Sequence, residues 1–352
     1  MAENTPTLEE WRRLYDGMIR VKELAPWEWM IETDIFGVQN PETDELGFVS
    51  VMGQLGEHYS IAVYLGPKGL YDFWDFEDAG PSAPAEHLIE IPQLQASFED
   101  RNQLADKDRQ VIKKLGLKFR GRNAWPMFRS YRPGYFPWFV EAEEARFLTV
   151  VLEQVLDVTP RFREDRTLLE PPGFESYLVR VPSQQGDALS WKDQTMSVVP
   201  PEPEPIPLSM DVELLEKLTR APKSKGRIEI DFFMFPAPTR DKEEDRPFFP
   251  YALMTVEAQS GMILGTELLK PEPSLEAMWG LIPMHVVAHL VRTGAVPREV
   301  RVRSELLVQV LEPVADELGF KLRQSDTLSS LDRAKRSMLR RLTGHVSDQV
   351  PM

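Results

Sequence analysis

The sequence contains no cysteine, and this absence removes several kinds of chemistry at once. Disulfide bonds, zinc–thiolate sites and cysteine nucleophiles all need a thiol, and a chain without thiols suits a reducing cytoplasm. Gly-rich phosphate loops, GxSxG nucleophile elbows and dinucleotide fingerprints are also missing. We therefore expect a cytoplasmic protein, and we predict no cofactor for it.

Long apolar runs and an excess of basic residues are missing as well. The best apolar stretch, GLIPMHVVAHLV (280–291), is too short to cross a bilayer, which takes about 20 apolar residues. The N-terminus, MAENTPTLEEW, lacks the basic start and apolar core of a signal peptide. Asp and Glu outnumber Lys and Arg by 56 to 41, a net charge of −15 that repels phosphate backbones. We expect a protein partner rather than a nucleic acid or a membrane.

A proline-rich segment, VVPPEPEPIPLS (198–209), divides the chain. Alternating prolines favour an extended polyproline II backbone that cannot join a helix or a central strand. The 352 residues suit two domains rather than one. We predict a first domain over 1–197, a linker over 198–209 and a second domain over 210–352.

The first half mixes helices and strands irregularly. Thr7 and Glu10 form a capping-box pattern at the start of an amphipathic helix that ends before Pro26. Period-two apolar spacing predicts a hairpin from strands 47–53 and 59–66. Further strands are predicted at 88–91, 177–181 and 189–197, and helices at 68–76, 106–115 and 141–158. This pattern is typical of an α+β domain.

The second half is more regular. Strands are predicted at 227–235, 251–257, 262–269, 299–303 and 320–323, and helices at 274–293, 304–318 and 328–342. The predicted order is β-β-β-α-β-α-β-α. We expect an α/β domain with a mixed sheet.

This order resembles the ribonuclease H-like fold of retroviral integrases and transposases. The stretches IEIDFF, PYALMTVEAQSGMILG and VPREVRVRSELLVQVLEPVADELGFKL carry the resemblance over about residues 226–342. The whole chain is also similar to a bacterial family that combines two domains of unknown function. The phrase GFVSVMGQLGEHYSIAVYLGPKGL carries that second resemblance, which implies no activity.

The first resemblance implies a test for catalysis. Active ribonuclease H-like proteins hold two divalent metals with an aspartate on the first strand, another at the end of the fourth strand, and an acid from a helix. Asp231 matches the first position, but the second falls at Arg303–Ser304, where no carboxylate stands. Glu305 lies one residue further on. The resemblance therefore implies a catalytically degenerate module, because one carboxylate cannot hold two hard cations.

Two hypotheses follow for Asp231. In the leading one the protein is a non-catalytic binding or protein-interaction protein, and Asp231 shares a half-solvated strand face with Glu229. In the alternative it is a divalent-metal-dependent nuclease or phosphodiesterase, in which Glu257 or Asp326 supplies the second carboxylate.

His285 and His289 form a second candidate, because histidines four residues apart lie on one face of a helix. An HxxxH pair binds zinc when a third ligand arrives from elsewhere. Val286 replaces the glutamate of the HExxH hydrolase motif. The alternative is a pair of partly buried histidines without a metal.

The stretch RGRNAWPMFRSYRPGYFPWF (120–139) interleaves arginines with aromatic residues. This composition is typical of protein interfaces and of grooves for single-stranded nucleic acid or anionic ligands. Its alternative is a proline-kinked loop whose rings fill a small core. The binding candidates are Arg129, Tyr131, Arg132 and Trp138.

The last helix is strongly basic, with Arg333, Lys335, Arg336, Arg340 and Arg341. Basic residues late in a helix complement its dipole, which is sufficient to explain them. The functional alternative is a docking surface for an acidic partner or a sister domain.

Overall fold

The computed structural model describes residues 4–80, 86–170, 173, 175–185, 188–235, 237–243 and 245–346. The chain divides into two compact units, Met1–Glu202 and Pro203–Met352. The boundary lies in the proline-rich segment, and residues 198–211 form neither helix nor strand. No helix of the described residues is long and apolar enough to span a bilayer.

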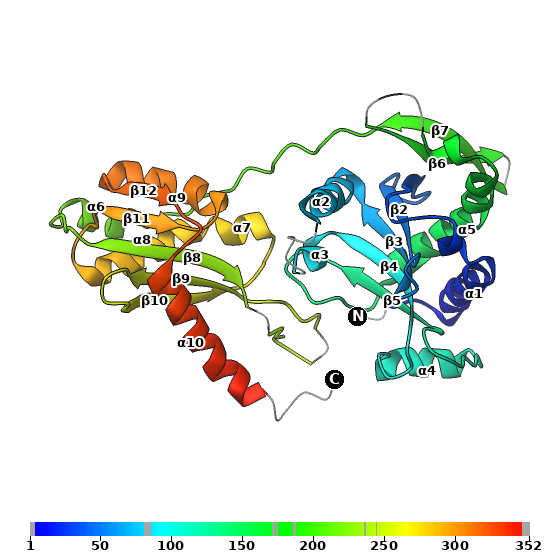
Figure 1. The fold of residues 1–352 in the computed structure, drawn as a ribbon, viewed down its shortest axis with the longest axis horizontal. Helices are drawn as coiled ribbons and strands as arrows, with labels where there is room; N and C mark the ends of the chain where they lie inside the picture. Colours follow the sequence, from blue (N-terminus) through cyan, green and yellow to red (C-terminus); the bar gives the residue numbers. More distant parts are fainter. Residues whose placement is uncertain are drawn as a thin grey trace. The chain divides into compact units, whose positions relative to one another are not determined.

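The first unit is built on a mixed sheet (Figure 1). Its described strands follow the order β5-β4-β3-β2-β1-β6-β7, in which β1 and β6 are parallel and all other neighbours antiparallel. The strands are β1 (Phe36–Gln39), β2 (Leu46–Met52), β3 (Tyr59–Leu65), β4 (Gln93–Glu99), β5 (Trp125–Tyr131), β6 (Ser176–Gln185) and β7 (Ala188–Ser197). The predicted hairpin is confirmed, with Val49 opposite Val63 and Val51 opposite Ile61.

Helices cover both faces of this sheet. The first-unit helices are α1 (Leu8–Leu24), α2 (Gly66–Ala79), α3 (Glu86–Glu90), α4 (Asp106–Lys114) and α5 (Ala142–Glu164), with 3-10 turns η1 (Pro26–Glu28) and η3 (Arg166–Leu169). α1 and α5 pack on one face around Leu14, Met18 and Leu148, and α2 packs on the other through Phe73. The predicted capping box of Thr7 and Glu10 starts α1.

Two local predictions for the first unit are wrong. Residues 88–91 are not a strand, because α3 ends at Glu90 and the strand begins after Pro92. That strand, β4, alternates buried Leu94, Ala96 and Phe98 with more polar residues. The stretch 120–139 is not wholly a loop, since β5 pairs with β4 along its length.

The second unit contains a mixed sheet of the predicted kind. Its described strands follow the order β10-β9-β8-β11-β12, with β9 antiparallel to both of its neighbours, β8 and β10, and β8, β11 and β12 parallel. The strands are β8 (Arg227–Met234), β9 (Tyr251–Glu257), β10 (Ile263–Leu269), β11 (Glu299–Val302) and β12 (Lys321–Gln324). The helices are α6 (Val212–Thr219), α7 (Leu275–Trp279), α8 (Ile282–Thr293), α9 (Glu305–Leu318) and α10 (Ser329–Val346).

The two faces of this second sheet differ. On one face, Ile228 and Ile230 of β8 belong to a large apolar core that includes residues of α8 and α9. On the other face, Met254 and Val256 of β9 pack with Leu331 in a smaller cluster against α10 (Figure 1). The candidate site lies on this second face, at the start of α10.

Candidate functional site: a neutralised acidic centre beside an arginine-lined hollow

Asp231 lies within β8 and is only 2% exposed. Its Oδ1 accepts the backbone N–H of Phe232 at 3.0 Å. Its Oδ2 lies 3.1 Å from Nε of Arg303 and 3.8 Å from Nζ of Lys335. Arg303 directly follows β11, the parallel neighbour of β8, so strand pairing brings the two side chains together. A buried carboxylate needs such a cationic partner to remain ionised.

Arg303 also connects Asp231 to the first turn of α10. Its terminal nitrogens donate to the Asp332 carboxylate and to the backbone carbonyl of Asp326. Burial opposes the charge of Arg303, but Asp231 and Asp332 outweigh it and raise the pKa of the guanidinium. Burial lowers the pKa of Lys335, against the attraction of Asp231. Two carboxylates thus meet two cations in one network.

Glu229 fixes α10 at the same place. Its Oε2 accepts the backbone N–H groups of Ser330 and Leu331, each at 2.9 Å. These N–H groups at a helix start have no partner within the helix, and the helix dipole favours a negative charge there. The expectation that Glu229 and Asp231 share a half-solvated face is wrong, because α10 covers that face and leaves Glu229 6% exposed.

The two other predicted carboxylates are occupied elsewhere. Glu257 pairs across the sheet with Ile228, three residues from Asp231, and accepts the backbone N–H of Ser260. That hydrogen-bonded turn lowers the pKa of Glu257. Asp326 is exposed and reaches the network only through its backbone carbonyl. Within the described residues, no group of three or more metal-ligating side chains occurs.

The acid that does join Asp231 was missed by the sequence reasoning. Asp332 stands in the first turn of the last helix, where the resemblance implies an acid from a helix. The signal available in the sequence was its position among basic residues near the start of that helix. Glu229 gave no signal, because its partners are backbone groups about one hundred residues away.

His289 of α8 is buried, at 2% exposure, and contacts residues of β9 and β10. Its Nδ1 lies 2.9 Å from Oγ1 of Thr255, and its Nε2 lies 3.4 Å from Oε1 of Glu267. Burial lowers its pKa, although Glu267 acts in the opposite direction. The ring lies so close to Gly265 that a Cβ at that position would overlap it. His285, one turn earlier, is partly exposed.

The four binding candidates of the first unit lie on or directly after β5, the edge strand of its sheet. Arg129 forms a two-pronged pair with Asp108, at 2.7 and 3.0 Å. The Tyr131 hydroxyl donates to Gln95 at 2.7 Å, and Arg132 pairs with Glu141 and Glu144. Trp138 is half-buried against Phe139 and its backbone pairs with Ser130. Their role in binding stays a prediction.

The outer face of α10 carries a row of exposed residues at helical spacing: Arg333, Arg336, Ser337 and Arg340. We call this row the arginine stripe. None of its arginines forms an ion pair with another residue of the described chain. By contrast, the inner face places Leu331 and Met338 against the sheet.

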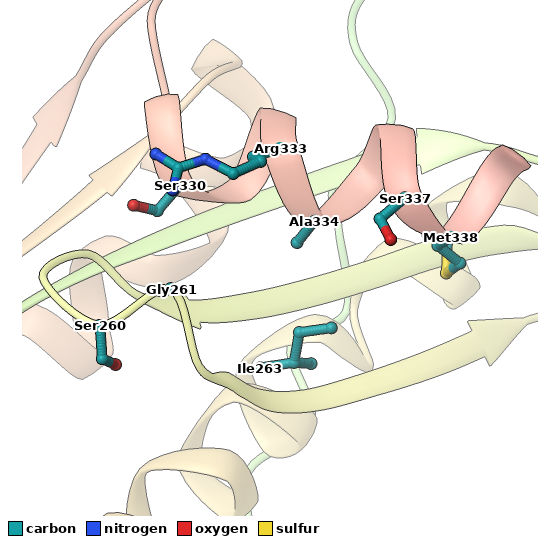
Figure 2. A pocket seen from close by; sticks show the side chains of 8 residues that line it. All are labelled: Ser260, Gly261, Ile263, Ser330, Arg333, Ala334, Ser337 and Met338. Carbon is teal, nitrogen blue, oxygen red and sulfur yellow. The ribbon is translucent and has the colours of Figure 1, made fainter.

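An open hollow of about 670 Å³ adjoins the arginine stripe. Figure 2 shows Ile263 pointing from β10 towards α10, with Ala334, Ser337 and Met338 on the helix side. The β9–β10 turn closes one end, and a second hollow of about 330 Å³ continues along Arg336 and Arg340. Ile263 remains 49% exposed. An apolar floor thus lies next to guanidinium groups that form no ion pair with the residues that the structure describes.

Comparison with known proteins finds one family match in each unit, and neither family has an assigned activity. Residues 11–180 match the family model of a domain of unknown function, DUF7309. Residues 214–339 match that of another domain of unknown function, DUF6930. No curated protein is similar to the chain. The two matches agree with a two-domain family of unknown function.

Proposed function

We propose that this is a non-catalytic cytoplasmic protein that binds a protein partner, and that its second unit is a catalytically degenerate ribonuclease H-like module. One observation carries the proposal. Arg303 occupies the position where the resemblance implies the second acid, and its guanidinium joins the two remaining acids, Asp231 and Asp332.

The charges of this centre support a structural role. Divalent cations need several oxygen ligands each, and here the oxygens of Asp231 and Asp332 already face Arg303 and Lys335. A metal would have to displace a bonded guanidinium and would separate that partly exposed cation from both of its carboxylate partners. The sheet also agrees with the proposal, since three antiparallel strands are followed by two parallel ones.

The arginine stripe is the proposed contact surface. Unpaired arginines recognise carboxylates through paired hydrogen bonds, and the hollow beside them can take an apolar side chain. The partner that fits is an acidic protein segment with one apolar anchor. The apolar hollow beside the arginines favours such a segment over nucleic acid, because only the segment offers an apolar side chain.

A nuclease assay tests the non-catalytic part. We expect the purified full-length protein to show no Mn²⁺-dependent cleavage of single- or double-stranded DNA or RNA beyond that of an Asp231→Asn preparation. Cleavage that Asp231→Asn abolishes would establish the alternative, a metal-dependent nuclease.

A charge-reversal experiment tests the surface. The probe is a fluorescent peptide of alternating Glu with a central Leu, and the variant is Arg336→Glu with Arg340→Glu. We expect the variant to lower the affinity at least about tenfold, because each lost charged hydrogen bond contributes about 1.5–3 kcal/mol. The matched control reverses Lys217 and Arg220, two exposed cations of α6.

The control variant should bind within about twofold of the wild type, since exposed charges away from an interface contribute little. Equal losses of peptide affinity in both variants would indicate non-specific charge attraction. They would contradict the proposal that the arginine stripe is the contact surface. Tighter binding of a single-stranded oligonucleotide than of the peptide would contradict the choice of partner.

A further inference from the structure

The first unit contains a pocket of about 280 Å³ in which aromatic and acidic side chains meet. Its inner wall includes Tyr64 of β3 and Phe73 of α2, whose rings stack at 4.5 Å between centroids, and Phe76 one turn further along α2. Its described lining residues also include Glu32, Glu57 and Glu77, but no Lys or Arg. The volume suits one small group.

The acids of this pocket act on one another. The pKa of Glu77 is raised, first by burial and then by the negative charges of Glu32 and Asp78. Neighbouring carboxylates of this kind repel each other unless a cation lies between them. His58 is the nearest basic candidate in the lining, but its Nδ1 lies 3.7 Å from the Glu99 carboxylate instead.

Tyr64 supplies an independent observation. Its side chain is fully buried, and its hydroxyl has no hydrogen-bond partner among the described residues. The Ser50 hydroxyl lies near it and donates its own hydrogen to the Glu32 carbonyl at 2.8 Å, so Ser50 can only accept from the phenol and leaves the Tyr64 oxygen without a donor. Burial raises the pKa of Tyr64, and the charges of Glu77 and Glu32, which line the same pocket, raise it further. A buried polar atom without a partner costs about 1–3 kcal/mol.

We propose that this pocket binds a primary alkylammonium group, either of a small amine or of a lysine side chain from another protein. The ammonium has three N–H donors, which match the Tyr64 oxygen and the carboxylates of Glu32 and Glu77. The alkyl chain lies against Phe73 and Phe76, whose ring faces also attract a cation. A neutral or anionic group of the same size has no positive charge to offer to the carboxylates and the aromatic rings.

Calorimetric titration of the full-length protein at neutral pH tests the inference with three probes of equal chain length: n-pentylamine, pentan-1-ol and pentanoate. We expect the amine to bind at least about tenfold more tightly than the alcohol and the acid, as expected for charge-assisted hydrogen bonds. Equal affinity of the amine and the alcohol would overturn the proposal.

Two variants locate the binding. Tyr64→Phe and Glu77→Gln should each weaken pentylamine binding about tenfold or more, whereas Asp75→Asn, on the exposed face of α2, should leave it within about twofold. Tyr64→Phe removes an unpaired buried hydroxyl, so its melting temperature should not fall below that of the wild type. Unchanged affinity in a folded Tyr64→Phe variant would refute the role of the hydroxyl and with it the proposal.

The source of the ammonium is decided by a fourth probe, N-acetyl-lysine-N-methylamide. Tighter binding of this probe than of pentylamine, lost again in Tyr64→Phe, would indicate a lysine side chain of a partner. Tighter binding of pentylamine would indicate a small amine. Binding of neither probe would overturn the proposal.

Discussion

Each unit contains an acidic site, and the two sites hold their carboxylates in opposite ways. In the second unit, Asp231 and Asp332 have cationic partners from their own chain, Arg303 and Lys335. In the first unit, the pocket acids face a buried hydroxyl without a partner, and no Lys or Arg is among the described lining residues. The charge composition of the two units differs in the same direction. Residues 1–202 contain 34 acidic and 21 basic residues, whereas residues 203–352 contain 22 acidic and 20 basic residues.

The two kinds of acidic site are expected to have different roles, one in stability and the other in binding. An acid paired within the chain contributes to the folded state, so removing its partner should destabilise the protein. An acid without a partner is a cost to the folded state that a bound cation can offset. If acids of both kinds responded alike to substitution, the two sites would not differ in this way.

The largest expected effect is that of Arg303→Ala, which leaves Asp231 buried beside Lys335 alone. We expect a loss of about 3 kcal/mol in the free energy of unfolding, at the low end for a broken buried pair because Arg303 is partly exposed. Urea unfolding followed by circular dichroism measures it. The double variant Asp231→Asn with Arg303→Ala should lose less than Arg303→Ala alone, since no buried charge is then left over.

The control for this prediction is Arg323→Ala, because Arg323 is 59% exposed and lies 3.9 Å from Glu299. We expect it to change the free energy of unfolding by less than about 0.5 kcal/mol. A loss of similar size in both arginine variants would show that the Asp231 centre has no special role in stability.

A smaller effect is expected from truncating Glu229 to alanine. The substitution removes the acceptor of two backbone N–H groups at the start of α10, and lost helix caps cost about 1–2 kcal/mol. Glu77→Ala, in the pocket of the first unit, should cost less or even stabilise the protein. Thermal unfolding of the two variants side by side would contradict our comparison if Glu77→Ala were the more damaging one.

The smallest effect concerns pH and His289. Its pKa is lowered in the folded state, so below about 6.5 the unfolded chain binds a proton that the folded chain excludes. Stability should therefore fall as the pH decreases through 6.5, and the loss should level off below the folded-state pKa. Urea unfolding at pH 7.5, 6.5 and 5.5 should show a flatter profile for His289→Gln, while His285→Gln keeps the slope.

The sequence predicted the five strands, α9 and α10 of the second unit and its mixed sheet, because apolar periodicity and helix caps are local signals. Ser304 and Gly319, for example, bound α9 as their residue types suggest. The sequence missed α6 and predicted one helix over 274–293 where the structure has α7 and α8. It did not predict β4, which begins directly after Pro92 and whose apolar residues alternate with Gln and Ser. Such a strand is recognisable mainly through its pairing with β3 and β5.

The site was only partly predictable for a related reason. The resemblance singled out Asp231 and the absence of a carboxylate at Arg303–Ser304, whereas the pairing of Asp231 with Arg303 depends on strand register. The role of Glu229 depends on where α10 lies, which no local pattern encodes. The pocket around Tyr64 combines residues from β3, α2 and the segment before β1, so no single stretch indicated it.

The contact between Gly265 and His289 has a consequence for how related sequences can vary. A methyl group at position 265 would overlap the imidazole ring, so the two positions cannot change independently. A relative with alanine or valine at 265 must carry a smaller side chain at 289, and it then loses the partner of the Thr255 hydroxyl as well. Positions 255, 265 and 289, on two strands and one helix, therefore constrain one another. A substitution at one of them is tolerated only after a compensating substitution at another.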